Sequence, residues 1–403
     1  MGETLAPERN VGLRRYVPPL SAAIPILIFA VAALALPLAT AAALALTANQ
    51  LGGWIVVLFG IPAILSMALT GVYRQPLLVA WHTQAVVFLA TLAGQLGYAE
   101  MLGAMLVSGG VVALLGATGL TSRLATLIPG PVVFAVVAGA TMPFVVGIFN
   151  TLGTERVLIG GTLLAYLLGR RFLGARVPGV LPALLVGLAL VAVTGRLGHV
   201  PTGWSLPAPG LAHPAFSLRA IATIVPVVVP LIALQSNLVW VAYLRGQGYC
   251  PPARVIDVAT GLGTMLAAFV GPAPICMGSA LVPLAAGPEA GERDVRHWSV
   301  YATAAGFALV ALGASIAAGL PSVLPLTLLL AVAGLALVGA LGQAIGELAR
   351  GPLRLGPLFA FAIASSKLTL LGLGPLFWAL VGGTVIAYLL EREEMRAVRI
   401  VST

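Results

Sequence analysis

The chain has 403 residues, of which 60% are hydrophobic and only 8% charged, and its net charge at pH 7 is +9. Soluble domains carry roughly 25% charged residues, so this composition excludes a water-covered surface over most of the chain. The arginines occupy short gaps between apolar runs, which favours membrane topology signals over the nucleic-acid binding that a basic soluble domain suggests. No nucleic-acid partner is therefore expected.

The apolar runs predict an all-α polytopic membrane protein with about fourteen transmembrane segments, since a helix needs about 20 apolar residues to cross the hydrocarbon core. In chain order the predicted spans are residues 18–45, 49–72, 76–95, 99–119, 130–150, 155–170, 179–196, 219–243, 253–270, 272–289, 298–319, 323–342, 355–371 and 374–390. The amino-terminal segment is polar and shows no signal-peptide cleavage pattern.

The arginines divide unevenly between the two sides of the membrane that these spans define. One side receives seventeen, and the other receives only Arg156, Arg196 and Arg219. The positive-inside rule then predicts that both termini are cytoplasmic, in the inner membrane of a bacterial cell. A segment rich in proline and glycine, residues 197–218, lies mid-chain on the opposite side and is interpreted as the linker between two halves.

The two halves are weakly alike. Three sets of residues recur at an offset of 195 to 197 positions: Gly109 and Gly116 with Gly306 and Gly313, 136–139 with 331–334, and 81–84 with 276–279. Seven spans per half is an odd number, so a repeat would insert with inverted orientation. Inverted repeats are typical of secondary transporters, which hold substrate near the membrane midplane.

The third and tenth predicted spans begin with proline-rich, extended-looking segments. Residues 76–84 and 272–279 each run from proline through a small polar group into an apolar helical run. Proline disfavours helix before it, and Thr83 and Ser279 are suitable N-caps for the half-helices that follow. Extended backbone must be buried or line a cavity. Two helix N-termini meeting at the midplane are predicted to bind an anion.

Polar residues near these breaks form the predicted substrate site. Its members are Trp81, His82, Thr83, Gln84, Gln235, Ser236, Asn237, Cys276, Met277, Gly278 and Ser279. His82 is the candidate proton carrier, with a neutral histidine bonded to backbone carbonyls as the alternative. For Gln235, Ser236 and Asn237 the alternative is hydrogen bonding between helices. No metal-ligand spacing or phosphate loop is present, so no cofactor or metal is expected.

Three further charged residues receive structural interpretations. Glu100 and Asp257 are expected to cap the helices that begin near them. Lys367 is expected to extend from the end of its span to the membrane interface. The cysteines, Cys250 in a predicted loop and Cys276 in a span, imply no disulfide.

The chain resembles the benzoate:proton symporter (BenE) family over nearly its whole length. The residues that carry the resemblance are Tyr73-Arg74-Gln75-Pro76 with Ala80-Trp81, Gly97-Tyr98-Ala99-Glu100 with Gly103-Ala104, Asn237-Leu238 with Leu244-Arg245, Gly248-Tyr249 with Pro251-Pro252, Gly287-Pro288-Glu289-Ala290, and Phe377-Trp378. That family is similar to uracil and sulfate permeases of seven-plus-seven inverted-repeat fold. The resemblance implies a core domain (18–119 and 219–319) and a gate domain (120–196 and 320–390), flanked by cytoplasmic segments 1–17 and 391–403.

The chain also departs from that family. His82 replaces a small residue, Val239-Trp240 replaces Pro-Gly, and Ala273 and Cys276 stand where His and Asn are usual. Gln235 and Ser279 lie near the carboxylate positions of nucleobase permeases, so a carboxylate proton relay is not implied.

The resulting hypothesis is a non-enzymatic transporter of a small organic anion, benzoate or a related aromatic carboxylate, coupled to protons and working by alternating access. A nucleobase or inorganic-anion transporter of the same fold, and an anion channel, are the alternatives. For the oligomeric state, a homodimer is one of the alternatives.

Overall fold

The computed structural model describes residues 15–173, 179–198, 204–205, 207, 209–278, 281–350, 352–366 and 368–395, without the side chains of Thr126 and Arg350. The predictions for Ser279, for Lys367 and for most of the two terminal segments lie outside these residues.

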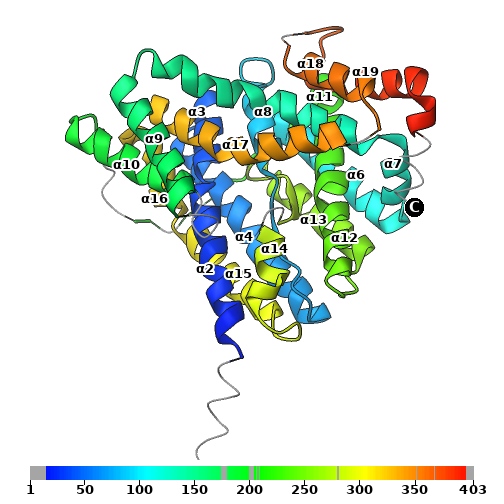
Figure 1. Ribbon diagram of the computed structural model, residues 1–403, viewed down its shortest axis with the longest axis horizontal. Helices are drawn as coiled ribbons and strands as arrows, with labels where there is room; N and C mark the ends of the chain where they lie inside the picture. Colours follow the sequence, from blue (N-terminus) through cyan, green and yellow to red (C-terminus); the bar gives the residue numbers. More distant parts are fainter. Residues whose placement is uncertain are drawn as a thin grey trace, which may run out of the picture.

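The described residues form helices and one pair of short strands (Figure 1). In chain order the elements are α2 (Val17–Ala32), α3 (Ala35–Ala43), α4 (Ala48–Tyr73), β1 (Val79–Trp81), α5 (Thr83–Ala90), α6 (Tyr98–Thr118), α7 (Thr121–Leu127), α8 (Gly130–Leu152), α9 (Arg156–Phe172), α10 (Val180–Val193), α11 (Leu218–Pro230), η2 (Leu231–Leu238), α12 (Val239–Gly246), α13 (Ala253–Ala267), β2 (Ile275–Met277), α14 (Leu281–Ala286), η3 (Pro288–Ala290), α15 (His297–Leu312), α16 (Ala314–Val323), α17 (Leu326–Arg350), α18 (Leu355–Ala364) and α19 (Pro375–Leu390).

The long apolar helices confirm a membrane protein. Within the described residues six helices are long and apolar enough to span a bilayer, and α15 with α16 makes a seventh if this pair, bent by 58°, is one span. Shorter apolar helices are α10, α18 and α19. The bend falls at Gly313, where the sequence predicts one continuous span (298–319). A predicted span therefore need not be one straight helix.

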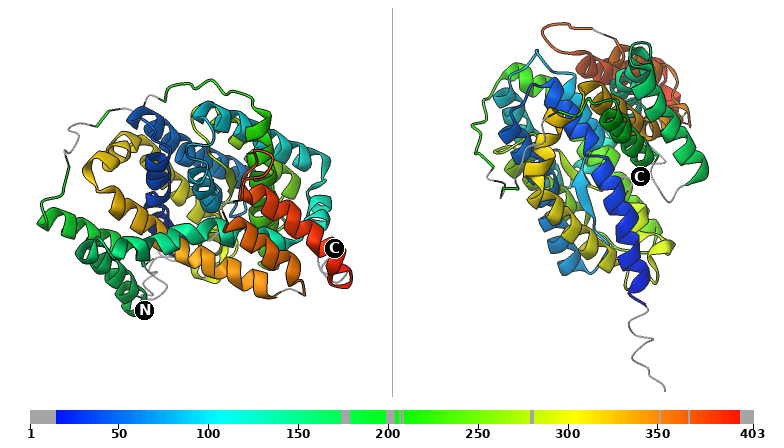
Figure 2. Two further views of the ribbon diagram at one scale, coloured as in Figure 1. Left: turned by 90° about the horizontal axis from the view of Figure 1, so that it is seen from above. Right: turned by 90° about the vertical axis from the view of Figure 1, so that its left-hand side faces the viewer.

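The third and tenth predicted spans are broken as expected. Each begins with a strand, β1 or β2, followed by a short helix, α5 or α14. The strands pair antiparallel, with Ala80 opposite Cys276. β2 begins 196 residues after β1, which agrees with the offsets in the sequence. The right-hand view of Figure 2 shows the light-blue arrow of β1 inside the molecule, between helices. The predicted helical membrane fold with short extended segments in spans 3 and 10 is confirmed, whereas the number of about fourteen spans stays a prediction.

Glycines allow the helices around the strands to pack closely. A Cβ on Gly109 of α6 would lie 2.6 Å from the carbonyl oxygen of Gly261 on α13. A Cβ on Gly116, two turns later, would lie 2.6 Å from Cβ of Asp257. Small residues at such contacts let helix backbones approach in membranes, so α6 and α13 pack closely beside β2.

A second hydrophobic cluster lies away from the strands. It joins buried residues of α9, α10 and α17, among them Ile159, Tyr166, Ala183 and Leu335. In Figure 1, α17 (orange) crosses the molecule, and it packs against α3, α8 and α9. The helices of this cluster face the strands across the cavity described below.

Candidate functional site

The first half-helix begins at the end of β1. The N–H of His82 donates to the carbonyl of Pro274 across the strand pair (2.8 Å). Nδ1 of His82 then accepts a hydrogen bond from the N–H of Ala85 (3.2 Å), which makes His82 the N-cap of α5. The prediction that Thr83 is the cap is wrong by one residue. The imidazole of His82 accepts the hydrogen bond from the N–H of Ala85, which is the contact that an N-cap side chain makes. Thr83 Oγ1 is left to donate to Gln84 Oε1 (2.9 Å).

The neutral form of His82 is set by this cap. Because Nδ1 accepts a hydrogen bond from a backbone amide, it carries no proton, and the ring hydrogen of the neutral imidazole lies on Nε2. The ring is almost completely buried, at 1% exposure. The N–H donor of the ring is therefore on Nε2, and the side chain of Gln235 is its interaction partner among the described residues.

The second half-helix follows β2 in the same manner. The N–H of Gly278 donates to the carbonyl of Leu78 (2.8 Å), and the N–H of Leu281 donates to the carbonyl of Gly278 (2.7 Å) as α14 begins. A Cβ on Gly278 would lie 3.2 Å from the oxygen of Leu78, so a larger residue would press on the strand. Because the strands are antiparallel, α5 starts beside Pro274, before β2, and Gly278, which precedes α14, lies beside Leu78, before β1. The two half-helix starts therefore lie at opposite ends of the strand pair.

A buried hydrogen-bond network holds β2 in place. Ser236 Oγ donates to the carbonyl of Met277 (2.7 Å), and Asn237 Oδ1 accepts from the N–H of Met277 (2.9 Å). Asn237 Nδ2 donates to Asp257 Oδ1 (2.9 Å) and Thr260 Oγ1 (2.8 Å). Ser236 and Asn237 therefore act as supports of the strand, through hydrogen bonds between helices.

Asp257 completes this network and is not a helix cap. Its Oδ2 accepts from Thr121 Oγ1 (2.7 Å), at the start of α7, and the residue is 5% exposed. Two donors thus satisfy a carboxylate that lies in the second turn of α13. The expectation for Glu100 holds, because its Oε2 accepts from the N–H of Gly97 (2.8 Å) at the start of α6.

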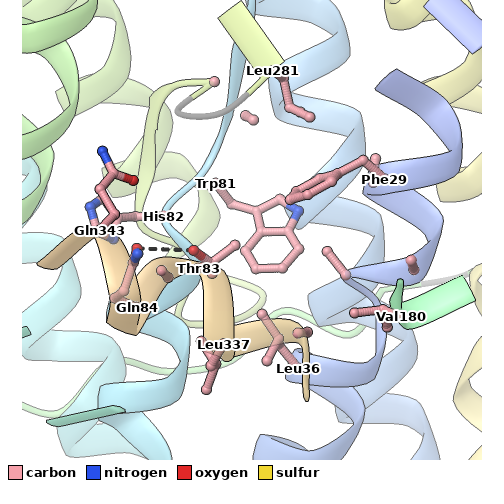
Figure 3. Close-up of a pocket in the computed structure, with 18 of the residues that line it drawn as sticks. Phe29, Leu36, Trp81, His82, Thr83, Gln84, Val180, Leu281, Leu337 and Gln343 are labelled. Carbon is pink, nitrogen blue, oxygen red and sulfur yellow. Dashed lines mark hydrogen bonds between the residues drawn. The ribbon is translucent and has the colours of Figure 1, made fainter. Parts of the chain in front are cut away.

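A cavity of about 370 Å³ lies against the two half-helix starts (Figure 3). Its lining comes from both halves of the chain and is mostly apolar: Phe29, Ala30, Ala32, Ala33, Leu36, Ala80, Trp81, His82, Thr83, Gln84, Phe134, Tyr166, Arg170, Gly179, Val180, Gln235, Val239, Trp240, Gly278, Leu281, Phe307, Leu335, Ala336, Leu337, Gly339, Ala340 and Gln343. This volume is in the range of small-molecule sites, about 300–1,000 Å³.

Aromatic rings form part of the apolar lining, beside a larger number of aliphatic side chains. Figure 3 shows the indole of Trp81 between Phe29 on one side and Thr83 with Gln84 on the other. Phe59 packs against Trp81, with ring centroids 6.2 Å apart in an edge-to-face arrangement. Flat apolar walls of this kind favour a planar ligand, since aromatic contacts add to simple burial.

Polar groups are few and gather near the half-helix starts. His82, Thr83, Gln84 and Gln235 line the cavity there, and Oε1 of Gln235 is buried without a hydrogen-bond partner among the described residues. A buried polar atom without a partner costs about 1–3 kcal/mol, so a ligand or water that satisfies it is favoured. Gln235 lies in η2, a π-helical segment that directly follows Pro230, and such segments are frequent at functional sites.

The structure divides the predicted site residues into two sets. Six line the cavity: Trp81, His82, Thr83, Gln84, Gln235 and Gly278. Ser236, Asn237, Cys276 and Met277 are buried behind it, and Ser279 lies outside the described residues. Within the described part of the chain no cluster of three His, Cys, Asp or Glu residues is arranged to hold a metal ion.

Several lining residues were not predicted as part of the site. Phe29, Phe134 and Phe307 belong to apolar runs and carry no local signal. Arg170 and Gln343 come from α9 and α17. Arg170 is one of the seventeen arginines on the predicted cytoplasmic side, and its position at a span end predicts only a topology signal, because that position explains its charge without a ligand.

The fold and the cavity, with its broken helices meeting inside a bundle of apolar helices, define a membrane transporter. The family model described as benzoate membrane transport protein (BenE) matches residues 17–389, and the chain belongs to this family.

Two curated relatives are similar to this chain over most of its length. The chain is 28% identical over 342 residues to "Inner membrane protein YdcO" of Escherichia coli K12, covering 84% of this chain and 87% of that protein. It is 28% identical over 336 residues to "Benzoate membrane transport protein" of Acinetobacter baylyi, covering 81% and 84% respectively.

Solved structures share the fold. The transmembrane domain of the cyanobacterial bicarbonate transporter BicA superposes with a TM-score of 0.55 at 15% identity, covering 96% of this chain and 97% of that one. The murine anion transporter Slc26a9 in the inward-facing state superposes with a TM-score of 0.59 at 13% identity, covering 98% and 74%.

Proposed function

We propose that this protein is a secondary active transporter of a small organic anion, an aromatic carboxylate such as benzoate, in the bacterial inner membrane. The observation that carries the proposal is the meeting of two half-helix starts, α5 and α14, at one cavity with aromatic walls. Helix N-termini favour negative charge because their N–H groups lack partners. The aromatic walls suit a flat apolar ring.

The cavity offers polar groups for the carboxylate of such a substrate and aromatic side chains for its ring. Nε2–H of His82 is a donor suited to a carboxylate oxygen, and the hydroxyl of Thr83 lies at the first residue of α5. Trp81 and Phe29 stand beside this region in Figure 3 and would contact the ring. The relative from Acinetobacter baylyi, named a benzoate transport protein, supports the same substrate class.

Proton coupling is part of the proposal, through His82 or through the substrate carboxyl itself. The capping bond favours the second route. A proton on Nδ1 of His82 would face the N–H of Ala85 and break the cap of α5. A carboxylic acid proton, in contrast, can be donated to Oε1 of Gln235, which has no partner among the described residues.

The transport cycle we propose is alternating access, in which a core domain (18–119 and 219–319) moves against a gate domain (120–196 and 320–390). The cavity supports this division because α5 and η2 line one side of it while α9, α10 and α17 contribute the other. Arg170 and Gly179 lie toward the arginine-rich side assigned to the cytoplasm, so the structure is interpreted as inward-facing.

Uptake by purified protein in proteoliposomes tests the function. We expect saturable accumulation of labelled benzoate driven by an inward proton gradient and abolished by a protonophore, with protein-free liposomes as the control. Saturation only by uracil-like solutes would instead indicate the nucleobase alternative. Uptake only of inorganic anions, or ohmic chloride currents without benzoate accumulation, would contradict the proposal.

A further inference from the structure

We infer that Arg170 forms a second, charge-selective anion subsite at the mouth of the cavity, separate from the half-helix starts, where the carboxylate is held on its way between those starts and the cytoplasm. This inference rests on the proposed function and adds to it a position and a residue. Its structural basis is a lining arginine on α9 that has no partner within the described residues.

Arg170 is both solvent-exposed and part of the cavity lining, so it lies where the cavity opens. Its side chain is directed by Gly179, which begins α10. A Cβ on Gly179 would lie 2.7 Å from Cγ of Arg170 and 3.1 Å from two ring carbons of Tyr166. The absence of a side chain at position 179 therefore gives room for the aliphatic part of Arg170 to pass beside the Tyr166 ring.

No described residue pairs with the positive charge of Arg170. Other arginines are engaged: Arg196 binds Glu155, Arg296 donates to the carbonyls of Gly291 and Ala286, and Arg219 donates to the carbonyl of Gly372. Arg170 makes no hydrogen bond or ion pair with any described residue. An arginine that serves only as a topology signal does not have to line a cavity. Arg171, the neighbour of Arg170, does not line this one.

The chemistry of the guanidinium fits a carboxylate in transit. Its N–H groups match the two oxygens of a planar carboxylate, and such charge-assisted pairs are stronger than neutral ones. Gln343 of α17 lines the same cavity, but it lies beside His82 and Gln84 near the start of α5 (Figure 3) and is not part of the Arg170 subsite. Between Val180, which follows Gly179, and the start of α5 the labelled lining residues are the apolar Leu36 and Leu337 (Figure 3), so an anion has two separate polar positions and can pass from one to the other.

Binding of labelled benzoate to the full-length protein in detergent tests the subsite at low and high ionic strength. Arg170→Gln should raise the benzoate Kd by roughly tenfold at low salt, because one charge-assisted contact is lost. It should also flatten the salt dependence, because exposed charges are screened by salt. Affinity for neutral benzamide should be unchanged. Arg171→Gln is the matched control, with the same charge change one residue away, and should behave as wild type.

Arg170→Lys keeps the charge without the planar fork, so we expect an intermediate Kd and a retained salt dependence. If Arg170→Gln and Arg171→Gln bind benzoate equally, or if Arg170→Lys loses the salt dependence, the subsite is refuted while the transport function stands. If the wild-type protein binds and transports no carboxylate, it is the proposed function that fails.

Discussion

At the scale of single residues, His82 combines two tasks in one side chain. Nδ1 caps α5 through Ala85, and the other side of the ring lines the cavity together with Gln235, with which it interacts. Asparagine is one of the residues preferred at N-caps, so it can take over the capping role of His82 without supplying the imidazole ring. The two tasks can therefore be separated by mutation.

We expect His82→Ala to reduce both stability and benzoate affinity, because it removes the cap and the donor together. Loss of a cap costs about 0.5–2 kcal/mol. His82→Asn should restore most of the thermal stability but leave the KM for uptake raised by roughly tenfold, because its amide is shorter than the imidazole. Thermal midpoints in detergent and proteoliposome uptake measure the two effects. Wild-type KM in His82→Ala would show that this residue does not contact the substrate.

Asp257 is a second residue whose role the hydrogen bonds define. We expect Asp257→Asn to retain uptake and its pH profile. The new amide oxygen can accept from Asn237, and the new NH2 can donate to Thr121, whose hydroxyl can turn to accept. Asp257→Ala should destabilise the protein by about 2 kcal/mol, because it leaves buried donors without partners. A loss of proton coupling in Asp257→Asn would contradict this supporting role and indicate a proton carrier.

At the scale of elements, the α9–α10 pair is joined beyond the ends of the two helices by a bidentate ion pair. Arg196 donates from Nη1 to Glu155 Oε2 (2.5 Å) and from Nη2 to Oε1 (2.8 Å). The hydrogen bonds from Arg196 are the main cause of a lowered pKa for the Glu155 carboxyl. The pair connects the beginning of α9 to the residues that follow α10, and α9 carries Arg170 on its last turn.

This ion pair predicts a small pH-dependent contribution to stability. A carboxyl whose pKa is lowered in the folded state stabilises at pH values above its unfolded value of about 4.5 and loses that contribution as the pH falls through the folded value. Glu155→Gln should therefore lower the thermal midpoint slightly at pH 7 and have no effect at pH values below the folded pKa. Glu289→Gln, a carboxyl outside this pair, is the control. An equal difference at all pH values would contradict the ion-pair origin.

At the scale of the whole molecule, the orientation in the membrane remains a prediction from the arginines. Cys250 provides a direct test, since it is exposed in the connection between α12 and α13, whereas Cys276 is buried. The arginine distribution assigns this connection to the cytoplasm.

A membrane-impermeant thiol reagent should label the protein in inside-out vesicles and not in right-side-out vesicles. The variant Cys250→Ser should abolish the labelling, which excludes a contribution from Cys276. Labelling only in right-side-out vesicles would reverse the topology and would move the mouth of the cavity, with Arg170, to the outer face.

The broken spans were predictable from local chemistry. Proline at 76 and at 272 and 274 disfavours helix, and extended backbone in a membrane has to be buried, so β1 and β2 follow from short stretches of sequence. The cap was misplaced by one residue because an imidazole at the right distance competes with a hydroxyl. That choice depends on the rotamer of His82, which the sequence does not specify.

The sequence by itself determined that the chain crosses a membrane and has two inverted halves whose broken segments meet. These properties depend on composition, proline positions and repeat offset, which are readable along the chain. Only the tertiary structure decided which polar residues reach the cavity. Gln235 lines it whereas its neighbours Ser236 and Asn237 hold β2, and Arg170 arrives from a separate helix. The physical reason is that the π-helical turn sets the direction of each side chain, and packing between distant helices sets which of them share a space.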